Sequence, residues 1–237
     1  MDKMDKINKD KVLALIEKHK DEKFIPEPVA EQILNFYSIP IPAGRLAKNA
    51  GQALSFAGKI GWPVVLKIVS PQIIHKSDSG GVITGINSAA ELNKAFKKIL
   101  KNVKAVDRKA KIEGVYVQKM VPVSREVIIG AINDQQFGAV VMFGLGGIFV
   151  ELFKDVVFRI APINKKQARK MVNDIKGLEL LKGIRGEKPI DFDSLFTAIS
   201  NVSRLIYDFP QIRELDVNPV CVSAKGICAI DARIILK

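Results

Sequence analysis

The run Val64-Val-Leu-Lys-Ile-Val69 is the feature that most constrains the fold, because it is apolar and largely β-branched except for one lysine. Such a run, bounded by Trp62-Pro63 and by the turn-rich segment 70–81, is typical of a strand buried on both faces. A lysine within that strand must either extend its amine out of the sheet or hold an anionic group. Lys67 is therefore a candidate binding residue, and an ordinary lysine on an exposed face is the alternative.

The elements predicted on either side of this strand do not follow the regular βαβ alternation of a dinucleotide-binding fold. Apolar periodicity predicts helices at about 28–37, 46–60, 91–103, 165–175 and 191–207, and strands at 82–86, 115–121, 126–132, 137–143, 156–160, 214–222 and 227–235. The segments 126–132 and 137–143 are joined by Asn133-Asp-Gln-Gln136, which is consistent with an antiparallel hairpin. We therefore expect an α/β (α+β) fold in two lobes that meet near Val121-Pro122.

Composition excludes several classes of protein. With 48% hydrophobic and 26% charged residues, the 237-residue chain can bury a core and does not resemble a disordered chain. The first ten residues contain no apolar signal segment, and no apolar stretch reaches the ~18 residues that a membrane span requires, so we expect a cytoplasmic protein with no membrane partner. Two cysteines and two histidines are too few for a four-ligand zinc site.

The charge of +12 is concentrated in segments 91–114 and 154–188. In the first of these the lysines fall on the face of a predicted helix opposite its apolar stripe, which is typical of a solvated surface. The basic residues are mostly lysine, whereas base readout favours arginine, and no nucleic-acid-binding motif is present. We expect no nucleic-acid partner, while attraction for anionic small molecules stays open.

The segment Ile74-His-Lys-Ser-Asp-Ser-Gly-Gly81 combines features of a phosphate-binding loop. Gly80 and Gly81 allow a close approach of the backbone, and Lys76 with the loop hydroxyls could hold phosphate oxygens. The segment has neither the Walker nor the dinucleotide fingerprint. Because the pKa of an unperturbed histidine is ~6.5, His75 offers a neutral nitrogen that could accept and pass on a phosphoryl group; a surface histidine is the alternative.

The segment Glu214-Leu-Asp-Val-Asn-Pro219 alternates, so Glu214, Asp216 and Asn218 should share one face of a strand. Such oxygen ligands suit Mg²⁺ that bridges nucleotide phosphates, and Asp231 on the partner strand could add a carboxylate. A solvated strand face is the alternative. The glycines of segment 144–147, followed by Glu151, predict either a second anion-facing loop or a bend that needs glycine.

Four segments in this order resemble the ATP-grasp β subunit of ADP-forming acyl-CoA (acetyl-CoA) synthetases, a relative of the succinyl-CoA synthetase β chain. These are PVVLKIVSPQIIHKSDSGGV, VYVQKMV, FGAVVMFGLGGIFVELFKDV and ELDVNPV, and the resemblance covers about residues 26–237. It implies a two-lobed ATP-grasp fold with mixed, largely antiparallel sheets. The smaller lobe would be 41–121, with Lys67 and the His75 loop, and the larger would be 24–40 and 122–237, with the metal-site hairpin. Residues 1–23 fall outside the resemblance, and their run of charges predicts a loosely attached N-terminal arm or helix.

The resemblance also implies roles for the candidate residues. Nucleotide would lie between the lobes, and His75 would be the second phosphoryl carrier, with Asp216 orienting it or joining the metal shell. The residues implied to bind ATP or ADP are Lys67, Ile74, Lys76, Gly80, Gly81, Gln118, Lys119, Val121 and Glu126, where Glu126 would hold the ribose, and those implied to bind Mg²⁺ are Asn218 and Asp231. Gln118 stands where the succinyl enzyme has a carboxylate, so its contact with the purine differs from the family pattern.

The activity implied by the resemblance is that of the nucleotide-binding β subunit of an ADP-forming acetate–CoA ligase. It would relay a phosphoryl group through a phosphohistidine, in acyl-CoA + ADP + phosphate ⇌ acid + CoA + ATP. No CoA-binding fingerprint is found in the sequence, so we expect a CoA-binding α subunit as partner, in an αβ or α₂β₂ assembly. The alternative is an ATP-grasp module of another ligase or of an acyltransferase-fused assembly.

Overall fold

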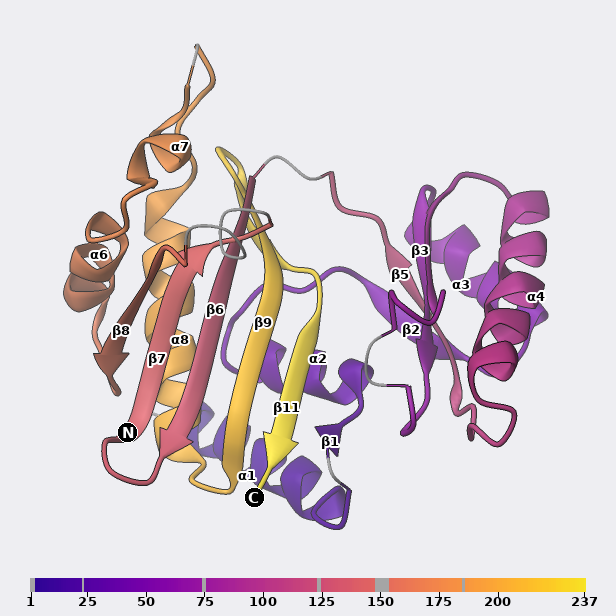
Figure 1. Ribbon diagram of the computed structural model, residues 1–237, viewed down its shortest axis with the longest axis horizontal. Helices are drawn as coiled ribbons and strands as arrows, with labels where there is room; N and C mark the ends of the chain where they lie inside the picture. Colours follow the sequence, from indigo (N-terminus) through magenta and orange to yellow (C-terminus); the bar gives the residue numbers. More distant parts are fainter. Residues whose placement is uncertain (1–2, 23, 74–75, 123–124, 148–153, 185) are drawn as a thin grey trace. The chain divides into compact units, whose positions relative to one another are not determined.

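The computed structural model describes residues 3–22, 24–73, 76–122, 125–147, 154–184 and 186–237, and Figure 1 shows their helices and strands. The chain divides into two compact units. The smaller unit is Pro42–Val121, and the larger unit is formed by Met1–Ile41 and Pro122–Lys237. Each unit has one sheet and its own hydrophobic core.

The smaller unit has a four-stranded antiparallel sheet in the order β2-β5-β3-β4. Its elements are β2 (Gly44–Ala47), α3 (Ala50–Ile60), β3 (Val64–Val69), β4 (Val82–Ile86), α4 (Ala89–Val106) and β5 (Gly114–Lys119). All six residues of β3 are buried, as the apolar run predicts. Helix α4 begins where the Ser88 hydroxyl accepts a hydrogen bond from the Glu91 N–H, and it buries Leu92, Phe96 and Ile99 against the sheet at helical spacing.

The larger unit has a seven-stranded sheet in the order β1-β11-β9-β6-β7-β8, with β10 also paired to β9. Its strands are β1 (Phe24–Ile25), β6 (Arg125–Asp134), β7 (Gly138–Leu145), β8 (Val156–Ile160), β9 (Ile212–Ser223), β10 (Gly226–Ala229) and β11 (Ala232–Leu236). Every pairing is antiparallel. The β6–β7 hairpin is confirmed, and its turn is held by the Asp134 carboxylate, which accepts hydrogen bonds from the N–H groups of Gln136 and Phe137.

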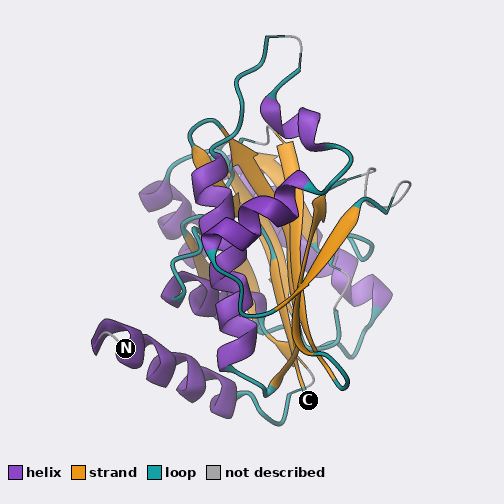
Figure 2. Cartoon of the chain, turned by 90° about the vertical axis from the view of Figure 1, so that its left-hand side faces the viewer, coloured by secondary structure: helices purple, strands orange, loops and turns teal. Residues whose placement is uncertain are grey.

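Helices of the larger unit pack against one face of this sheet, as Figure 2 shows from the side. They are α1 (Lys3–Lys18), α2 (Glu27–Phe36), α6 (Lys165–Asn173), α7 (Leu178–Lys182) and α8 (Phe192–Asp208). The core lies between helices and strands, with Phe143 of β7 and Ile199 of α8 fully buried. The mixed, antiparallel two-lobed fold expected from the sequence is therefore confirmed.

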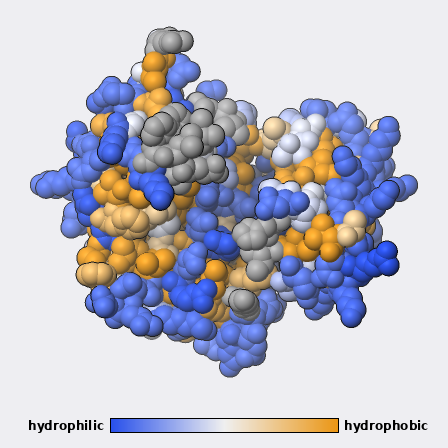
Figure 3. Space-filling model, viewed as in Figure 1, coloured by the Kyte–Doolittle hydropathy of each residue, from blue (hydrophilic) through white to orange (hydrophobic). Residues whose placement is uncertain are grey.

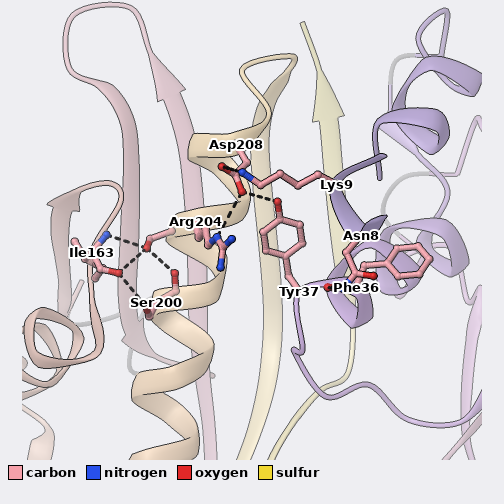
Figure 4. Close-up of polar contacts among 9 residues, drawn as sticks. Asn8, Lys9, Phe36, Tyr37, Ile163, Ser200, Arg204 and Asp208 are labelled. Carbon is pink, nitrogen blue, oxygen red and sulfur yellow. Dashed lines mark hydrogen bonds and ion pairs between the residues drawn. The ribbon is translucent and has the colours of Figure 1, made fainter. Parts of the chain in front are cut away.

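Helix α1 is attached to the larger unit through its apolar side and through Asp208 at the end of α8 (Figure 4). Val12 and Ile16 are buried in the core. The Lys9 amine lies 2.6 Å from Asp208 Oδ1, and the Tyr37 hydroxyl donates a 2.7 Å hydrogen bond to Asp208 Oδ2. The charged N-terminal segment thus forms a helix that shares the core of the larger unit.

Two predicted elements differ from the structure, one at its start and one by an internal break. The helix predicted at 46–60 begins at Ala50, because the Asn49 side chain caps it by accepting from the Gln52 N–H, and the residues before it form β2. The strand predicted at 227–235 is two strands, β10 and β11. Opposite this break lies Pro219, which has no N–H for the ladder. Among the described residues, no helix is long and apolar enough to cross a membrane.

Candidate functional site

Lys67 lies in β3 within the smaller unit's sheet, opposite Tyr116 of β5 and Val82 of β4. Only 4% of the residue is exposed, so the alternative of an exposed-face lysine is wrong. A buried ammonium group requires hydrogen bonds or an anionic partner to offset its lost hydration. Because it is buried, Lys67 remains a candidate for binding an anion.

The described part of the candidate phosphate loop is closed by its own hydrogen bonds. The Gly81 N–H donates to the Lys76 carbonyl at 2.6 Å, and the Ser79 hydroxyl donates to the same oxygen at 2.9 Å. Gly80 has φ of +61°, and a Cβ on Gly81 would lie 2.6 Å from a methyl group of Ile68. Both glycines are therefore needed for the shape of the loop, and phosphate binding by them stays a prediction. Ile74 and His75 lie outside the described residues.

Gln118, Lys119 and Val121, which the resemblance implies as nucleotide-binding residues, lie at and just after the end of β5. Gln118 is 1% exposed and lies between Val65 of β3 and Gly44 of β2. The Lys119 amine donates a 2.6 Å hydrogen bond to the Trp62 carbonyl, while Val121 is half-buried at the end of the unit. The Lys119 amine thus has a partner within the smaller unit.

The acidic row predicted near the C-terminus is present in β9. Leu215 and Val217 are buried in the core, while Glu214 and Asp216 lie half-buried on the other face of the strand. Arg233 of β11 is directly opposite Asp216. Its guanidinium lies 3.2 Å from Glu214 Oε1 and 3.6 Å from Asp216 Oδ2. Two carboxylates and one arginine therefore form a cluster on one face of the larger unit's sheet.

Electrostatics distinguish Asp216 from an ordinary surface carboxylate. Burial raises the pKa of Asp216, Arg233 opposes that shift, and the charges of Glu214 and Asp231 raise the pKa further. Sequence reasoning missed Arg233. The alternation of buried Ala232 and Ile234 around it could have indicated that it shares a face with Asp216.

Asn218 and Asp231 meet where β9 and the β10–β11 link lie side by side. The Asn218 N–H donates a 3.2 Å hydrogen bond to the Asp231 carbonyl. Their side chains supply one amide and one carboxylate oxygen, which are donors that Mg²⁺ accepts when phosphates and waters complete its shell. Among the described residues there is no group of three or more His, Cys, Asp or Glu side chains that could hold a metal ion. The two residues fit a magnesium ion that is shared with nucleotide.

Glu126 lies at the start of β6, opposite Cys221 of β9. Its carbonyl accepts a 2.8 Å hydrogen bond from the Gly146 N–H. A Cβ on Gly146 would lie 2.8 Å from the Cβ of Glu126, so this glycine is required by packing. That contact favours a bend at segment 144–147; Glu151 is outside the described residues.

Comparison with known proteins shows the family to which the chain belongs. The family model of the ATP-grasp domain matches residues 17–236. The β subunit of an ADP-forming acetate–CoA ligase I from Pyrococcus furiosus is 48% identical over 95% of this chain and 98% of its own.

Two solved structures of the dinucleotide-forming acetyl-CoA synthetase 1 of Candidatus Korarchaeum cryptofilum are also similar. One, in complex with coenzyme A, Ca-AMPCP and HgCl⁺, has a TM-score of 0.93 and 45% identity over 94% of this chain and 99% of that chain. The other holds coenzyme A and Mg-AMPPCP, with a phosphohistidine segment pointing towards the nucleotide-binding site; its TM-score is 0.85, with 41% identity over 95% of this chain and 100% of that chain. The chain therefore belongs to the ATP-grasp family and, within it, to the β subunits of ADP-forming acetate–CoA ligases.

Proposed function

We propose that the protein is the nucleotide-binding β subunit of an ADP-forming acyl-CoA ligase of the acetate–CoA type. The observation that carries the proposal is the 48% identity to the Pyrococcus furiosus β subunit along nearly its whole length. The reaction is acyl-CoA + ADP + phosphate ⇌ carboxylic acid + CoA + ATP. A CoA-binding α subunit completes the enzyme in an α₂β₂ heterotetramer in the cytoplasm.

The phosphates, the adenine and the ribose of the nucleotide contact different residues in this proposal. The buried Lys67 amine neutralises phosphate charge, and Lys76 with Ile74, Gly80 and Gly81 lines the phosphates. The strand end with Gln118, Lys119 and Val121 contacts adenine through its backbone, because the Lys119 amine is already bonded to the Trp62 carbonyl. Glu126 holds the ribose.

The magnesium ion of the nucleotide binds to the larger unit, where β9 and the β10–β11 link lie side by side. Asn218 and Asp231 would hold it, and when bound it neutralises charge on the transferred phosphoryl group. Asp216, half-buried beside Arg233, orients the imidazole of His75 by accepting a hydrogen bond from one ring nitrogen. The other ring nitrogen is then free to act as a nucleophile.

His75 is the carrier of the phosphoryl group. A nitrogen–phosphorus bond on a histidine of the α subunit breaks as a nitrogen–phosphorus bond to His75 forms. In the next step the bond to His75 breaks as a phosphorus–oxygen bond forms to the terminal phosphate of ADP, giving ATP. The protein has to supply only a transferable bond, in-line positioning and compensating charge.

The test is phosphorylation of the purified chain by Mg-ATP, with and without the α subunit encoded in the same genome. We expect intact mass spectrometry to show one acid-labile phosphoryl group, which is lost in His75→Ala. His19→Ala is the matched control, since His19 is the other histidine of the chain and is held beside Glu22 with Nδ1 3.0 Å from Oε1. Absence of the label while ATP still binds would overturn the carrier role and favour an ATP-grasp module of another ligase.

A further inference from the structure

Strand β8 (Val156–Ile160) forms one end of the larger unit's sheet. Within the part of the chain that the structure describes, it pairs with β7 alone. The Ala161 N–H donates a 2.8 Å hydrogen bond to the Ala139 carbonyl, which fixes the register. By alternation, Val157 and Arg159 also turn their backbone groups toward β7, whereas those of Phe158 and Ile160 point away from the sheet. The outer edge of β8 thus presents backbone donors and acceptors.

The side chains at this edge are apolar and exposed. Phe158 is 54% exposed and Ile160 is 56% exposed. Opposite them on β7 lie Met142 and Val140, so the apolar surface continues across two strands, and Figure 3 shows apolar side chains gathered over β7 and β8. Proteins normally protect such an edge with charge, proline or a covering segment, because it otherwise templates pairing with another chain.

A groove runs along the same edge on the helix side. It has a volume of about 650 Å³ and is lined by Arg159, Ile160, Ile163, Gln167, Lys170, Asn173 and Asp174. Figure 2 shows β8 at the near end of the sheet with helices to one side of it. The groove and the strand edge together have the form of a site for one additional strand.

The charge around this groove selects the occupant. Helix α6 carries exposed Lys166, Arg169 and Lys170, of which Lys170 lines the groove. The acidic residue that lines the groove, Asp174, already pairs with Arg159. A second copy of this chain would bring the same cations to the edge and be repelled, whereas a segment with acidic side chains would be attracted.

We propose that the outer edge of β8 and the groove beside α6 dock an extended segment of the CoA-binding subunit, with apolar residues alternating with acidic ones. Its backbone pairs with Phe158 and Ile160, its apolar side chains cover theirs, and its carboxylates face α6. This inference rests on the proposed function, because it takes the CoA-binding subunit as the partner.

Hydrogen exchange of the chain with and without the CoA-binding subunit tests the docking. We expect the amides of Phe158 and Ile160 to exchange at least tenfold more slowly in the complex. The double variant Phe158→Glu/Ile160→Glu should weaken the affinity for the CoA-binding subunit at least tenfold. Tyr207→Glu, which places one such charge at a 55% exposed aromatic residue of α8, should leave the affinity unchanged. Thermal unfolding of both variants shows that the larger unit remains folded.

Three results would overturn the proposal. If the complex is active but the β8 amides stay unprotected, or if the double variant binds the CoA-binding subunit as tightly as wild type does, the subunit docks elsewhere and the proposed function stands. If the isolated chain forms a dimer and the double variant does not, the occupant of this edge is a second copy of the chain. Absence of both binding and ligase activity in the mixture removes the proposed function together with this docking site.

Discussion

One face of the larger unit's sheet has two halves of opposite character. The side chains on this face alternate with those packed beneath the helices. One row of neighbours runs through Phe158, Met142, Gly130, Asp216 and Arg233, and the next runs through Ile160, Val140, Ile132, Glu214 and Ile235. The face is thus apolar on β7 and β8, whereas β9 and β11 carry Glu214, Asp216 and Arg233 beside one apolar residue, Ile235, and β6 is the border.

Both halves depart from what stability alone would favour. The charged half removes carboxylates partly from water, which raises the pKa of Asp216. The apolar half leaves Phe158 and Ile160 more than half exposed. A chain keeps such features when a ligand compensates for them, so the contrast points to two ligands: a metal–nucleotide complex on the charged half and a polypeptide on the apolar half.

The largest expected effect is a loss of stability when a phenylalanine ring is removed from the helix-covered face, compared with the same change on the apolar half. Phe143 is 0% exposed in the core, whereas Phe158 on the neighbouring strand is 54% exposed. Phe143→Ala should lower the free energy of unfolding by about 3–5 kcal/mol, since it removes a buried ring and leaves a cavity. Phe158→Ala should change it by less than about 0.5 kcal/mol. Urea unfolding of the isolated chain measures both, and similar losses would mean that Phe158 is part of the core.

The second effect tests whether the chemistry depends on the charged half and not on the apolar half. Asp231 precedes β11, and its charge raises the pKa of Asp216 in the charged half. Asp231→Asn should lower ligase turnover by about 100-fold or more, because it removes a proposed ligand of magnesium. Ile160→Ser on the apolar half should leave turnover unchanged when the CoA-binding subunit is saturating. The assay is ATP formation over a range of magnesium concentrations, with partial rescue of Asp231→Asn at high magnesium. An equal loss in both variants would erase the functional distinction between the halves.

A smaller effect follows from the raised pKa of Asp216. Because the folded chain holds this proton more tightly than the unfolded chain does, the carboxyl favours folding below its unfolded pKa of about 3.9, and this contribution is lost as the pH rises through the folded pKa. Asp216→Asn should therefore gain stability relative to wild type as the pH rises through that window. Arg233→Met should move the loss to higher pH, since Arg233 lowers the pKa of Asp216.

Hydrogen exchange of the β6 amides across a pH series measures this effect. Asp134→Asn is a control of opposite sign. Two backbone N–H groups lower the pKa of Asp134, so its contribution to stability is lost as the pH falls through its folded pKa. A pH-independent difference between Asp216→Asn and wild type would contradict the assignment.

The sequence predicted those parts of the fold that have a clear period. The apolar run of β3, the alternation of β9 and the stripe of α4 were predicted because burial fixes them directly. Strands β1 and β2 were missed because they are short and owe their existence to pairing with distant strands. The break between β10 and β11 depends on the link opposite Pro219, which periodicity does not reveal.

The candidate site was predicted to a similar degree. The shared face of Glu214 and Asp216 followed from alternation, but Arg233 did not, because its position depends on the register of β11 against β9. The glycines of segment 80–81 suggested a phosphate loop, and those of segment 144–147 suggested either an anion-facing loop or a bend. Close approach to Ile68 and Glu126 explains Gly81 and Gly146. Sequence indicates which residue types are unusual, and tertiary contacts decide why they are there.

The smallest expected effect concerns the border between the two halves. A Cβ on Gly130 of β6 would meet the terminal methyl group of Met142 at 3.1 Å, and that flexible side chain can move. Gly130→Ala should therefore raise the free energy of unfolding by about 0.5 kcal/mol, since glycine weakens a strand. A Cβ on Gly144 would lie 2.9 Å from the Asp155 carbonyl, so Gly144→Ala should lower it by about 1–3 kcal/mol. If urea unfolding shows that Gly130→Ala lowers the free energy of unfolding more than Gly144→Ala does, β6 requires a glycine at this position. The two halves would then be separated by packing at Gly130 as well as by the type of their side chains.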